Sequence, residues 1–252
     1  MYRNAAWPLA LSPLKVLSIP RRSSLISIMF PLAADAAMRE YYNQRASEYD
    51  EWYLREGVFA RRGDAERWHA EVAQLRERVQ QFGQGRLLEI ASGTGWWTQH
   101  LAQHAHVTVL DYAPAMLAQL SARLDALGLH AIRVRGDAYA LPFAATCFDC
   151  AFFGFWLSHV PHTRRLEFLH EVRRVLHPGS EVMIIDSAPT TPDQVPGAEF
   201  LHERVLNDGS RHQVLKIVHT PDSLAQALAR LGEVTKCWST GRYFSVAIVK
   251  IS

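Results

Sequence analysis

The part of the sequence that says most about chemistry is a short glycine-containing turn after a buried strand. Residues 87–95 read Leu-Leu-Glu-Ile-Ala-Ser-Gly-Thr-Gly, and a helix is expected to follow. Gly93 and Gly95 allow positive φ angles and leave room for ligand atoms, while the helix start offers unpaired backbone N–H groups and a partial positive charge. This pattern favours a nucleotide-like ligand, although a Gly-x-Gly turn can also serve chain reversal alone.

Two carboxylates follow the next two expected strands at corresponding positions. Asp111 ends the second strand, where a carboxylate can accept hydrogen bonds from both hydroxyls of a ribose. Asp137 and Ala138 follow the third strand, where a carboxylate and adjacent backbone suit the amino edge of an adenine. The alternative is that each aspartate only caps the helix after it. The ribose position serves NAD and S-adenosylmethionine equally, so Asp111 does not choose between these cofactors.

The residues after the glycines argue against a dinucleotide. The fingerprint for a pyrophosphate has a third glycine or alanine where this chain has Thr98, directly after the bulky Trp96 and Trp97. This mismatch makes an NAD-dependent oxidoreductase a weak interpretation. A non-catalytic cofactor-binding module stays open as a second alternative, because a fold does not determine chemistry.

The elements that must position these residues alternate between strands and helices. Short apolar runs indicate strands, and apolar residues three and four apart indicate helices. Strands are expected over 86–90, 107–110, 131–134, 150–153 and 181–185, with helices near 96–103, 114–127 and 163–176. The last of these helices is expected to be closed by His177, Pro178 and Gly179. Such alternation predicts a parallel sheet covered by helices on both faces.

The end of the chain departs from this alternation. A helix over 223–231 precedes strands over 234–239 and 243–250, and their short link makes these two strands antiparallel. Before that helix lies an insertion, residues 188–220, in which apolar runs flank Asn-Asp-Gly-Ser at 207–210. This arrangement predicts a β-hairpin inserted after the fifth strand.

The start of the chain differs in composition from the rest. Residues 1–37 contain four basic residues and one acidic residue, and prolines at positions 8, 13, 20 and 31 interrupt helical periodicity. We expect a disordered extension, either a transit peptide or an upstream start ahead of Met29 or Met38. From residue 38 the pattern becomes helical. Residues 38–252 are expected to form a single domain, in which 38–82 are helices that cover the site.

Composition argues against several classes of partner. The net charge of +2 and the charged fraction of 21% provide no strong field for nucleic acid or an anionic membrane. No apolar run approaches the ~20 residues that span a bilayer, so stable membrane insertion is not expected. The three cysteines favour a reducing, cytoplasmic setting, and they complete no metal site with one another or with histidines. No pattern specifies an oligomeric state.

Taken together, the motifs resemble the class I S-adenosylmethionine-dependent methyltransferases, specifically the small-molecule branch that includes ubiquinone/menaquinone-type C-methyltransferases. The resemblance runs from Tyr41 to Ile251 and rests on residues 89–95, 111–117, 136–138, 141–149 and 176–179. It implies a doubly wound, Rossmann-like α/β fold, whose mostly parallel seven-stranded sheet has an antiparallel last strand. It also implies S-adenosyl-L-methionine as the cofactor, bound at the carboxyl ends of the strands.

Position by position, the resemblance implies a cofactor site. Its members are Tyr49, Glu89, Ala91, Gly93, Gly95, Asp111, Tyr112, Met116, Asp137, Ala138 and Phe153. In this set Asp111 would hold the ribose and Asp137 the adenine amino group, while Tyr49 would close over the cofactor. Met116 suits a hydrophobic core equally well.

The segment after the fourth strand favours a small-molecule acceptor. Residues 153–156 read Phe-Gly-Phe-Trp, in place of the Asn/Asp-Pro-Pro-aromatic motif found in methyltransferases that act on exocyclic or side-chain amides. Trp96, Phe155, Trp156 and the hairpin are expected to form an apolar, partly covered acceptor pocket, with His162 beside it. Whether an O, N, C or S atom is methylated stays open.

His159 is the candidate catalytic residue. It lies just beyond the fourth strand and therefore at the same edge of the sheet as the glycine turn. An imidazole there could take a proton from a phenol, an acid or an activated carbon. The alternative is a histidine near a helix start that has no chemical task.

Overall fold

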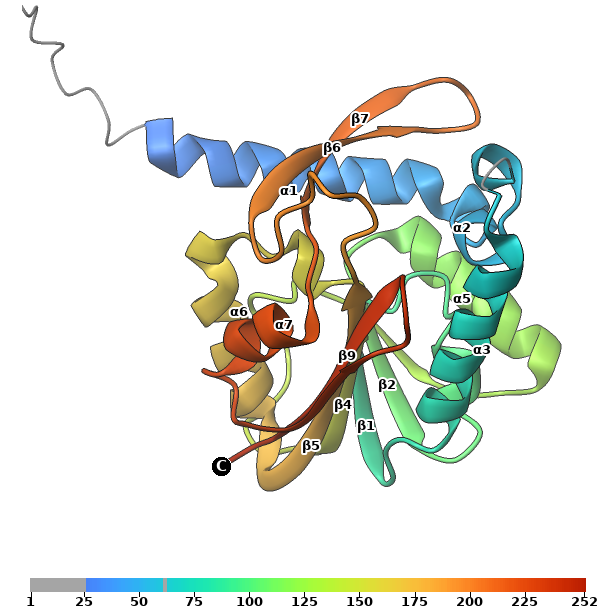
Figure 1. Ribbon diagram of the computed structural model, residues 1–252. Helices are drawn as coiled ribbons and strands as arrows, with labels where there is room; N and C mark the ends of the chain where they lie inside the picture. Colours follow the sequence, from blue (N-terminus) through green and yellow to red (C-terminus); the bar gives the residue numbers. More distant parts are fainter. Residues whose placement is uncertain (1–25, 61–62) are drawn as a thin grey trace, which may run out of the picture.

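The computed structural model describes residues 26–60 and 63–252 of the chain, with side chains described from residue 36 onward (Figure 1). A seven-stranded sheet forms its centre, in the order β3-β2-β1-β4-β5-β9-β8. The strands are β1 (Arg86–Ile90), β2 (His106–Asp111), β3 (Ile132–Arg135), β4 (Phe148–Gly154), β5 (Leu176–Ser187), β8 (Glu233–Ser239) and β9 (Phe244–Lys250). Strands β1 to β5 pair in parallel, whereas β9 is antiparallel to both of its neighbours. The predicted doubly wound fold with an antiparallel last strand is confirmed.

Helices cover both faces of this sheet, and each face has its own hydrophobic core. The helices α3 (Ala65–Gln80), α4 (Thr98–Leu101) and α5 (Pro114–Leu127) cover one face, and α6 (His162–Val175) and α7 (Pro221–Leu228) cover the other (Figure 1). Alternate side chains of one strand enter opposite cores, as Phe152 and Phe153 of β4 do. A strand buried on both faces is apolar along its whole length, which is why the sequence reveals these strands.

The junction between α6 and β5 differs from the predicted one. The sequence predicts a helix up to residue 176 and a stop at the following His-Pro-Gly, but β5 already begins at Leu176. Leu176 pairs with Phe148 of β4, and a register shift between Phe148 and Cys150 lets regular pairing resume at Glu181. Pairing to β4 therefore extends the fifth strand back to the end of α6.

The N-terminal helices lie over the carboxyl edge of the sheet. Helix α1 (Ile26–Arg45) begins well before Met38, where the sequence pattern becomes helical, and it contains Pro31. Residues 1–25 lie outside the described residues, so the expectation of a disordered extension can be compared only for 26–37, which are helical. After α1 come the short helix α2 (Glu51–Leu54) and then α3.

The predicted hairpin insertion is present and packs on α1. Its strands β6 (Glu199–Val205) and β7 (Arg211–Ile217) form a separate two-stranded antiparallel sheet. Met38 and Tyr41 of α1 share a small hydrophobic cluster with Leu206 and Val214 of the hairpin. The helix and the hairpin therefore form one continuous cover at this edge of the sheet (Figure 1).

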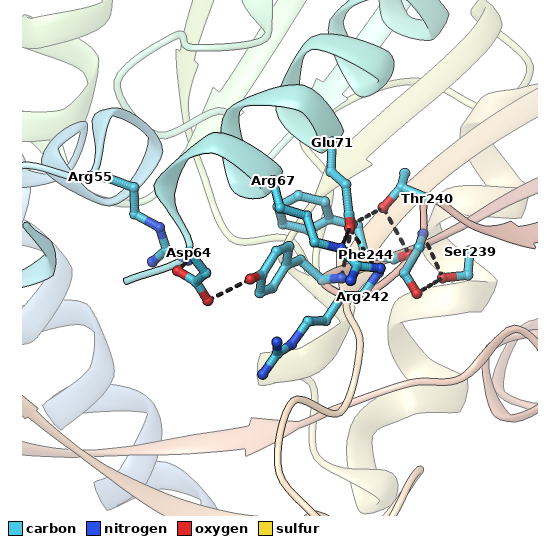
Figure 2. A network of polar contacts seen from close by, with 10 residues as sticks. Arg55, Asp64, Arg67, Glu71, Ser239, Thr240, Arg242 and Phe244 are labelled. Carbon is cyan, nitrogen blue, oxygen red and sulfur yellow. Dashed lines mark hydrogen bonds and ion pairs between the residues drawn. The ribbon is translucent and has the colours of Figure 1, made fainter. Parts of the chain in front are cut away.

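A buried carboxylate ties α3 to the turn between β8 and β9. Glu71 is 3% exposed and accepts hydrogen bonds from the Thr240 hydroxyl at 2.6 Å and from the backbone N–H groups of Arg242 at 2.8 Å and Tyr243 at 2.9 Å (Figure 2). The Tyr243 hydroxyl also donates to Asp64, just before α3. This network anchors α3, which follows α1 and α2 in the chain, onto the edge of the sheet.

Glu71→Ala is expected to lower the free energy of unfolding by about 2–4 kcal/mol, because two backbone N–H groups lose their acceptor. Burial alone would raise the pKa of Glu71, but the hydrogen bonds outweigh it and lower the pKa. The stabilisation is thus present above the unfolded-state pKa and is lost as pH falls through the folded-state value. Denaturant unfolding at pH 7 and at acidic pH measures both effects. The same substitution at Glu77, exposed on α3, should change stability little.

Candidate functional site

A cavity lies at the carboxyl ends of β1, β2, β3 and β4, and α1 covers it. Its wall combines residues of the loops after these strands with residues of α1. The lining residues are Met38, Arg39, Tyr42, Tyr49, Ala91, Gly93, Leu110, Asp111, Tyr112, Ala113, Met116, Gly136, Asp137, Ala138, Tyr139, Gly154, Phe155, Trp156 and His159. The cavity thus contains most of the cofactor residues expected from the sequence, together with Phe155, Trp156 and His159 from the expected acceptor site.

The glycine turn after β1 forms one wall. Ala91, Gly93 and Gly95 all have positive φ angles, of 54°, 56° and 77°. A Cβ atom at Gly93 would lie 3.7 Å from the ring of Tyr49, so glycine keeps the space between the turn and this tyrosine open. A Cβ at Gly95 would instead lie 2.8 Å from Leu120 of α5. Gly95 therefore lets the turn pack closely on α5 and is not itself part of the cavity wall.

Asp111 joins this turn to the start of α5. One carboxylate oxygen accepts a hydrogen bond from the Gly93 N–H at 2.8 Å, and the other accepts from the Ala113 N–H at 2.9 Å. Burial raises the pKa of Asp111, although these bonds act in the opposite direction. The aspartate thus ties the glycine turn to the residue that precedes α5, and it also lines the cavity with oxygens that can each accept a further hydrogen bond.

Asp137 is engaged by an arginine of α1. The Arg39 guanidinium donates to Asp137 at 2.6 Å and lies 3.8 Å from the ring centroid of Tyr112. The second oxygen of Asp137 accepts from the Tyr139 N–H at 2.9 Å. The carboxylate that the resemblance assigns to adenine therefore also binds the covering helix.

Two of the expected cofactor residues lie behind the cavity wall. Glu89 is 1% exposed and accepts a hydrogen bond from the Thr98 hydroxyl at 2.6 Å. Its burial raises its pKa to about 8. Phe153 is fully buried and packs against Phe168 of α6, with ring centroids 5.2 Å apart. Both residues support the wall from behind and do not line the cavity.

Trp96 and His162 also lie outside the lining, which corrects the acceptor pocket expected from the sequence. Trp96 stacks on Tyr53, with ring centroids 4.4 Å apart, because α2 and α3 offer it an aromatic surface away from the cavity. His162 is the exposed first residue of α6, and its Nε2 atom lies 2.9 Å from the Gly197 carbonyl oxygen. It contacts the base of the hairpin.

The lining of the cavity also includes a tyrosine and histidine pair. The Tyr42 hydroxyl lies 2.8 Å from Nε2 of His159, and Nδ1 of His159 lies 2.6 Å from the Leu215 carbonyl oxygen of β7. His159 follows β4 in a short 3-10 helix, Leu157–His159, and is 5% exposed. Burial lowers the pKa of His159 well below its ordinary value, and the nearby charge of Lys216 lowers it further. The histidine is therefore neutral at pH 7.

The walls around this pair are aromatic and apolar. Phe155 is 7% exposed and packs edge-on against Trp52, while Trp156 lies 5.9 Å from Tyr139 by ring centroids. Met38 completes the wall from α1. A planar apolar molecule could bind between these groups with one polar atom directed at Tyr42 and His159.

The sequence did not single out Tyr42, Arg39 or Leu215. Tyr42 lies in the tyrosine-rich stretch that was expected only to cover the site. Its spacing of four residues from Met38 places both on one face of α1, and this signal could have identified it. Leu215 acts through its backbone carbonyl, which no side-chain pattern reveals.

The described residues show no further type of site. Across residues 36–60 and 63–252, no three His, Cys, Asp or Glu side chains gather closely enough to hold a metal ion. Nor does any helix in the described part of the chain have both the length and the apolar character needed to cross a membrane.

Comparisons with known proteins agree with this geometry. A family model described as a methyltransferase domain matches residues 87–179. Demethylmenaquinone methyltransferase of Listeria welshimeri is 32% identical over 136 residues, which are 52% of this chain and 54% of the relative. Ubiquinone/menaquinone biosynthesis C-methyltransferase UbiE of Roseobacter denitrificans is 38% identical over 106 residues, 40% of this chain and 42% of the relative. The chain spans about half the length of the curated relatives it matches.

Solved structures match more of the chain. The DhpI-SAM-HEP complex has a TM-score of 0.68 and 28% identity, covering 85% of this chain and 96% of that chain. A 1,6-didemethyltoxoflavin-N1-methyltransferase of Burkholderia thailandensis shares the fold, with a TM-score of 0.63 over 94% of this chain and 93% of that chain. Together these similarities confirm the resemblance to the class I S-adenosylmethionine-dependent methyltransferases that was read from the motifs.

Proposed function

We propose that this protein transfers the methyl group of S-adenosylmethionine to a small apolar or aromatic acceptor. The observation that carries the proposal is a single cavity, whose lining includes both Gly93 and Asp111 and the Tyr42–His159 pair. The curated relatives named for quinone biosynthesis support a small-molecule acceptor.

The residues around the glycine turn fit S-adenosylmethionine. Asp111 presents a carboxylate for the ribose hydroxyls, and Met116 and Ala138 offer apolar surface to the adenine. The gap between Gly93 and Tyr49 would be filled by any Cβ atom at position 93, as expected of a cradle for ligand atoms. When bound, the cofactor supplies an electrophilic methyl group on a sulfonium.

The chain's own contribution is alignment, exclusion of water and handling of a proton. Helix α1 and the hairpin cover the cavity, so reacting groups inside it are held together away from bulk water. His159 is buried and neutral, and it faces the cavity beside Tyr42. This pair is suited to accept a proton that the acceptor must lose.

Binding and turnover measurements separate this function from its alternatives. We expect isothermal titration calorimetry to detect S-adenosylmethionine and S-adenosylhomocysteine but not NADH. Incubation with a panel of small aromatic acceptors should release S-adenosylhomocysteine. Binding of NADH alone would favour an oxidoreductase, and cofactor binding with no turnover across a broad panel would favour a non-catalytic module.

Asp111→Ala should weaken binding of S-adenosylmethionine by about 1.5–3 kcal/mol, roughly 10- to 150-fold, the scale of charge-assisted hydrogen bonds to a buried partner. Calorimetry measures the change, and thermal unfolding checks that loss of the hydrogen bonds to Gly93 and Ala113 has not unfolded the protein. Asp125→Ala, on the exposed side of α5, is the matched control and should leave affinity unaltered. An unchanged affinity for Asp111→Ala would remove this residue from the cofactor site.

A further inference from the structure

His159 is held at both of its ring nitrogens by the two parts of the cover. Tyr42 of α1 contacts Nε2 at 2.8 Å, and the Leu215 carbonyl of β7 contacts Nδ1 at 2.6 Å. The ring of Tyr42 also packs edge-on against the imidazole, with centroids 5.6 Å apart. One contact comes from helix α1 and the other from the hairpin, so these two elements together fix the protonation and orientation of the His159 ring.

The direction of each hydrogen bond follows from the partners. A backbone carbonyl can only accept, so Nδ1 of His159 carries the proton and donates to Leu215. A neutral imidazole then has an unprotonated Nε2, and the Tyr42 hydroxyl must donate to it. The lone pair of His159 is therefore already in use. The oxygen of Tyr42 keeps lone pairs that can accept a hydrogen bond from a further donor.

Tyr42, more than His159, is consequently the residue that a bound acceptor can contact directly. Both residues line the cavity, but His159 is 5% exposed, whereas Tyr42 is only partly buried. An acceptor hydroxyl that enters between the aromatic walls can donate to the Tyr42 oxygen while Tyr42 keeps its hydrogen bond to His159.

We propose that Tyr42 is a second catalytic residue, which takes the proton of a phenol-type acceptor and passes its own proton to His159. The inference rests on the proposed methyltransferase function and narrows its acceptor to an aromatic molecule with a neutral hydroxyl. Loss of that proton makes either the oxygen or an adjacent ring carbon nucleophilic.

The transfer balances without any further reactant. The O–H bond of the acceptor breaks as a new O–H bond forms on Tyr42, while the original O–H bond of Tyr42 breaks as an N–H bond forms on Nε2 of His159. The products are a phenolate and an imidazolium, so net charge is conserved and nothing is oxidised. The Leu215 carbonyl stabilises the imidazolium through the N–H on Nδ1.

The surrounding charges favour the phenolate over the imidazolium. Arg45 and Arg204 act on both Tyr42 and His159, and Lys216 acts on His159, so this end of the cavity has a positive potential. A phenolate bound here is attracted by these cations, and an imidazolium is repelled by them. The proton therefore leaves as the acceptor attacks the methyl group, because the O–H group of the acceptor becomes strongly acidic at that point.

A pair of simple probes tests the contact with the acceptor. We expect the full chain, without added cofactor, to bind 1-naphthol about tenfold more tightly than 1-methoxynaphthalene, the worth of one buried hydrogen bond. In Tyr42→Phe the two probes should bind with about equal affinity. Tyr41→Phe removes the hydroxyl of the preceding residue, which does not line the cavity, and should keep the tenfold preference. If Tyr42→Phe prefers 1-naphthol by the same factor as the original protein, the proposal is overturned.

Nitrogen-15 NMR of histidine-labelled protein tests the orientation of the pair without any acceptor. His159 should show a neutral ring with the proton on Nδ1, and Tyr42→Phe should shift the Nε2 resonance and leave Nδ1 nearly in place. A proton on Nε2 in the original protein overturns the relay. These readouts are independent of cofactor binding, so a failure to bind S-adenosylmethionine would reject the proposed function and not this contact.

Discussion

His159→Ala should lower the turnover of methyl transfer by about 10²–10⁴-fold, the usual contribution of a positioned acid–base group. The substitution removes the proton acceptor and leaves Tyr42 with no partner for its hydroxyl. Affinity for S-adenosylmethionine should barely change, because the contacts proposed for Asp111 and the glycine turn do not involve His159. Release of S-adenosylhomocysteine with an acceptor found by the panel measures turnover. His162→Ala, a histidine outside the lining, should keep nearly full turnover.

The pH profile of turnover distinguishes this site from an exposed histidine. An ordinary histidine has a pKa near 6.5 and would give a loss of activity around that pH. Burial, together with the charges of Lys216, Arg204 and Arg45, lowers the pKa of His159 well below that value. The reactive form is the neutral one, so turnover should stay level as pH falls through 6.5 and decline only at more acidic pH. A clear step near 6.5 that disappears in His159→Ala would contradict the buried, neutral state.

The sequence predicts the sheet well because each strand is buried on two faces. The run Cys-Ala-Phe-Phe at 150–153 is apolar throughout, and its side chains enter both cores alternately. The hairpin is predicted equally well, from the Asn-Asp-Gly-Ser turn between two apolar runs. The start of α1 is predicted less well, because Pro31 suggests a helix boundary, whereas α1 continues on both sides of this proline. Local rules identify elements more reliably than they identify element ends.

The meeting of Asp111 and Gly93 in the cavity could be predicted because position along a strand determines position in a parallel sheet. Asp111 and Gly93 follow neighbouring strands, so the fold brings them together at one edge. The acceptor end depends on α1 and the hairpin, whose placement over the sheet has no local signal. Trp96 shows the consequence, because it is adjacent to the glycine turn in sequence yet stacks on Tyr53, outside the cavity.

The second large effect is expected at a buried ion pair that holds the hairpin against the sheet. The ammonium group of Lys216 lies 3.6 Å from a carboxylate oxygen of Asp186 and donates hydrogen bonds to the hydroxyls of Ser158 at 2.7 Å and Ser187 at 3.1 Å. The side chains of Lys216 and Asp186 are 8% and 0% exposed. Lys216 follows Leu215 directly, and Ser158 precedes His159. The contacts of Lys216 therefore hold the Leu215 carbonyl close to the His159 ring.

Lys216→Met should lower the free energy of unfolding by about 3–5 kcal/mol, because Asp186 then stays buried without its counter-charge. Urea unfolding measures the loss. The double variant with Asp186→Asn should recover much of it, since a methionine and a neutral amide leave no isolated charge inside the protein. The opposite outcome is a loss of unfolding free energy in the double variant that equals the sum of the losses in the two single variants. In that case Lys216 and Asp186 are not coupled, and the hairpin is held by packing alone.

The pH dependence of stability gives an independent test of the same lysine. Burial lowers the pKa of Lys216 to about 8, although the charge of Asp186 acts in the opposite direction. In the unfolded chain the value is about 10.4, so between these two pH values the folded protein releases the proton while the unfolded chain keeps it. The contribution of Lys216 to stability should therefore increase with pH across this interval. Lys216→Met should lack this increase, and an identical pH dependence in both proteins would show that the ammonium group is not buried as the structure places it.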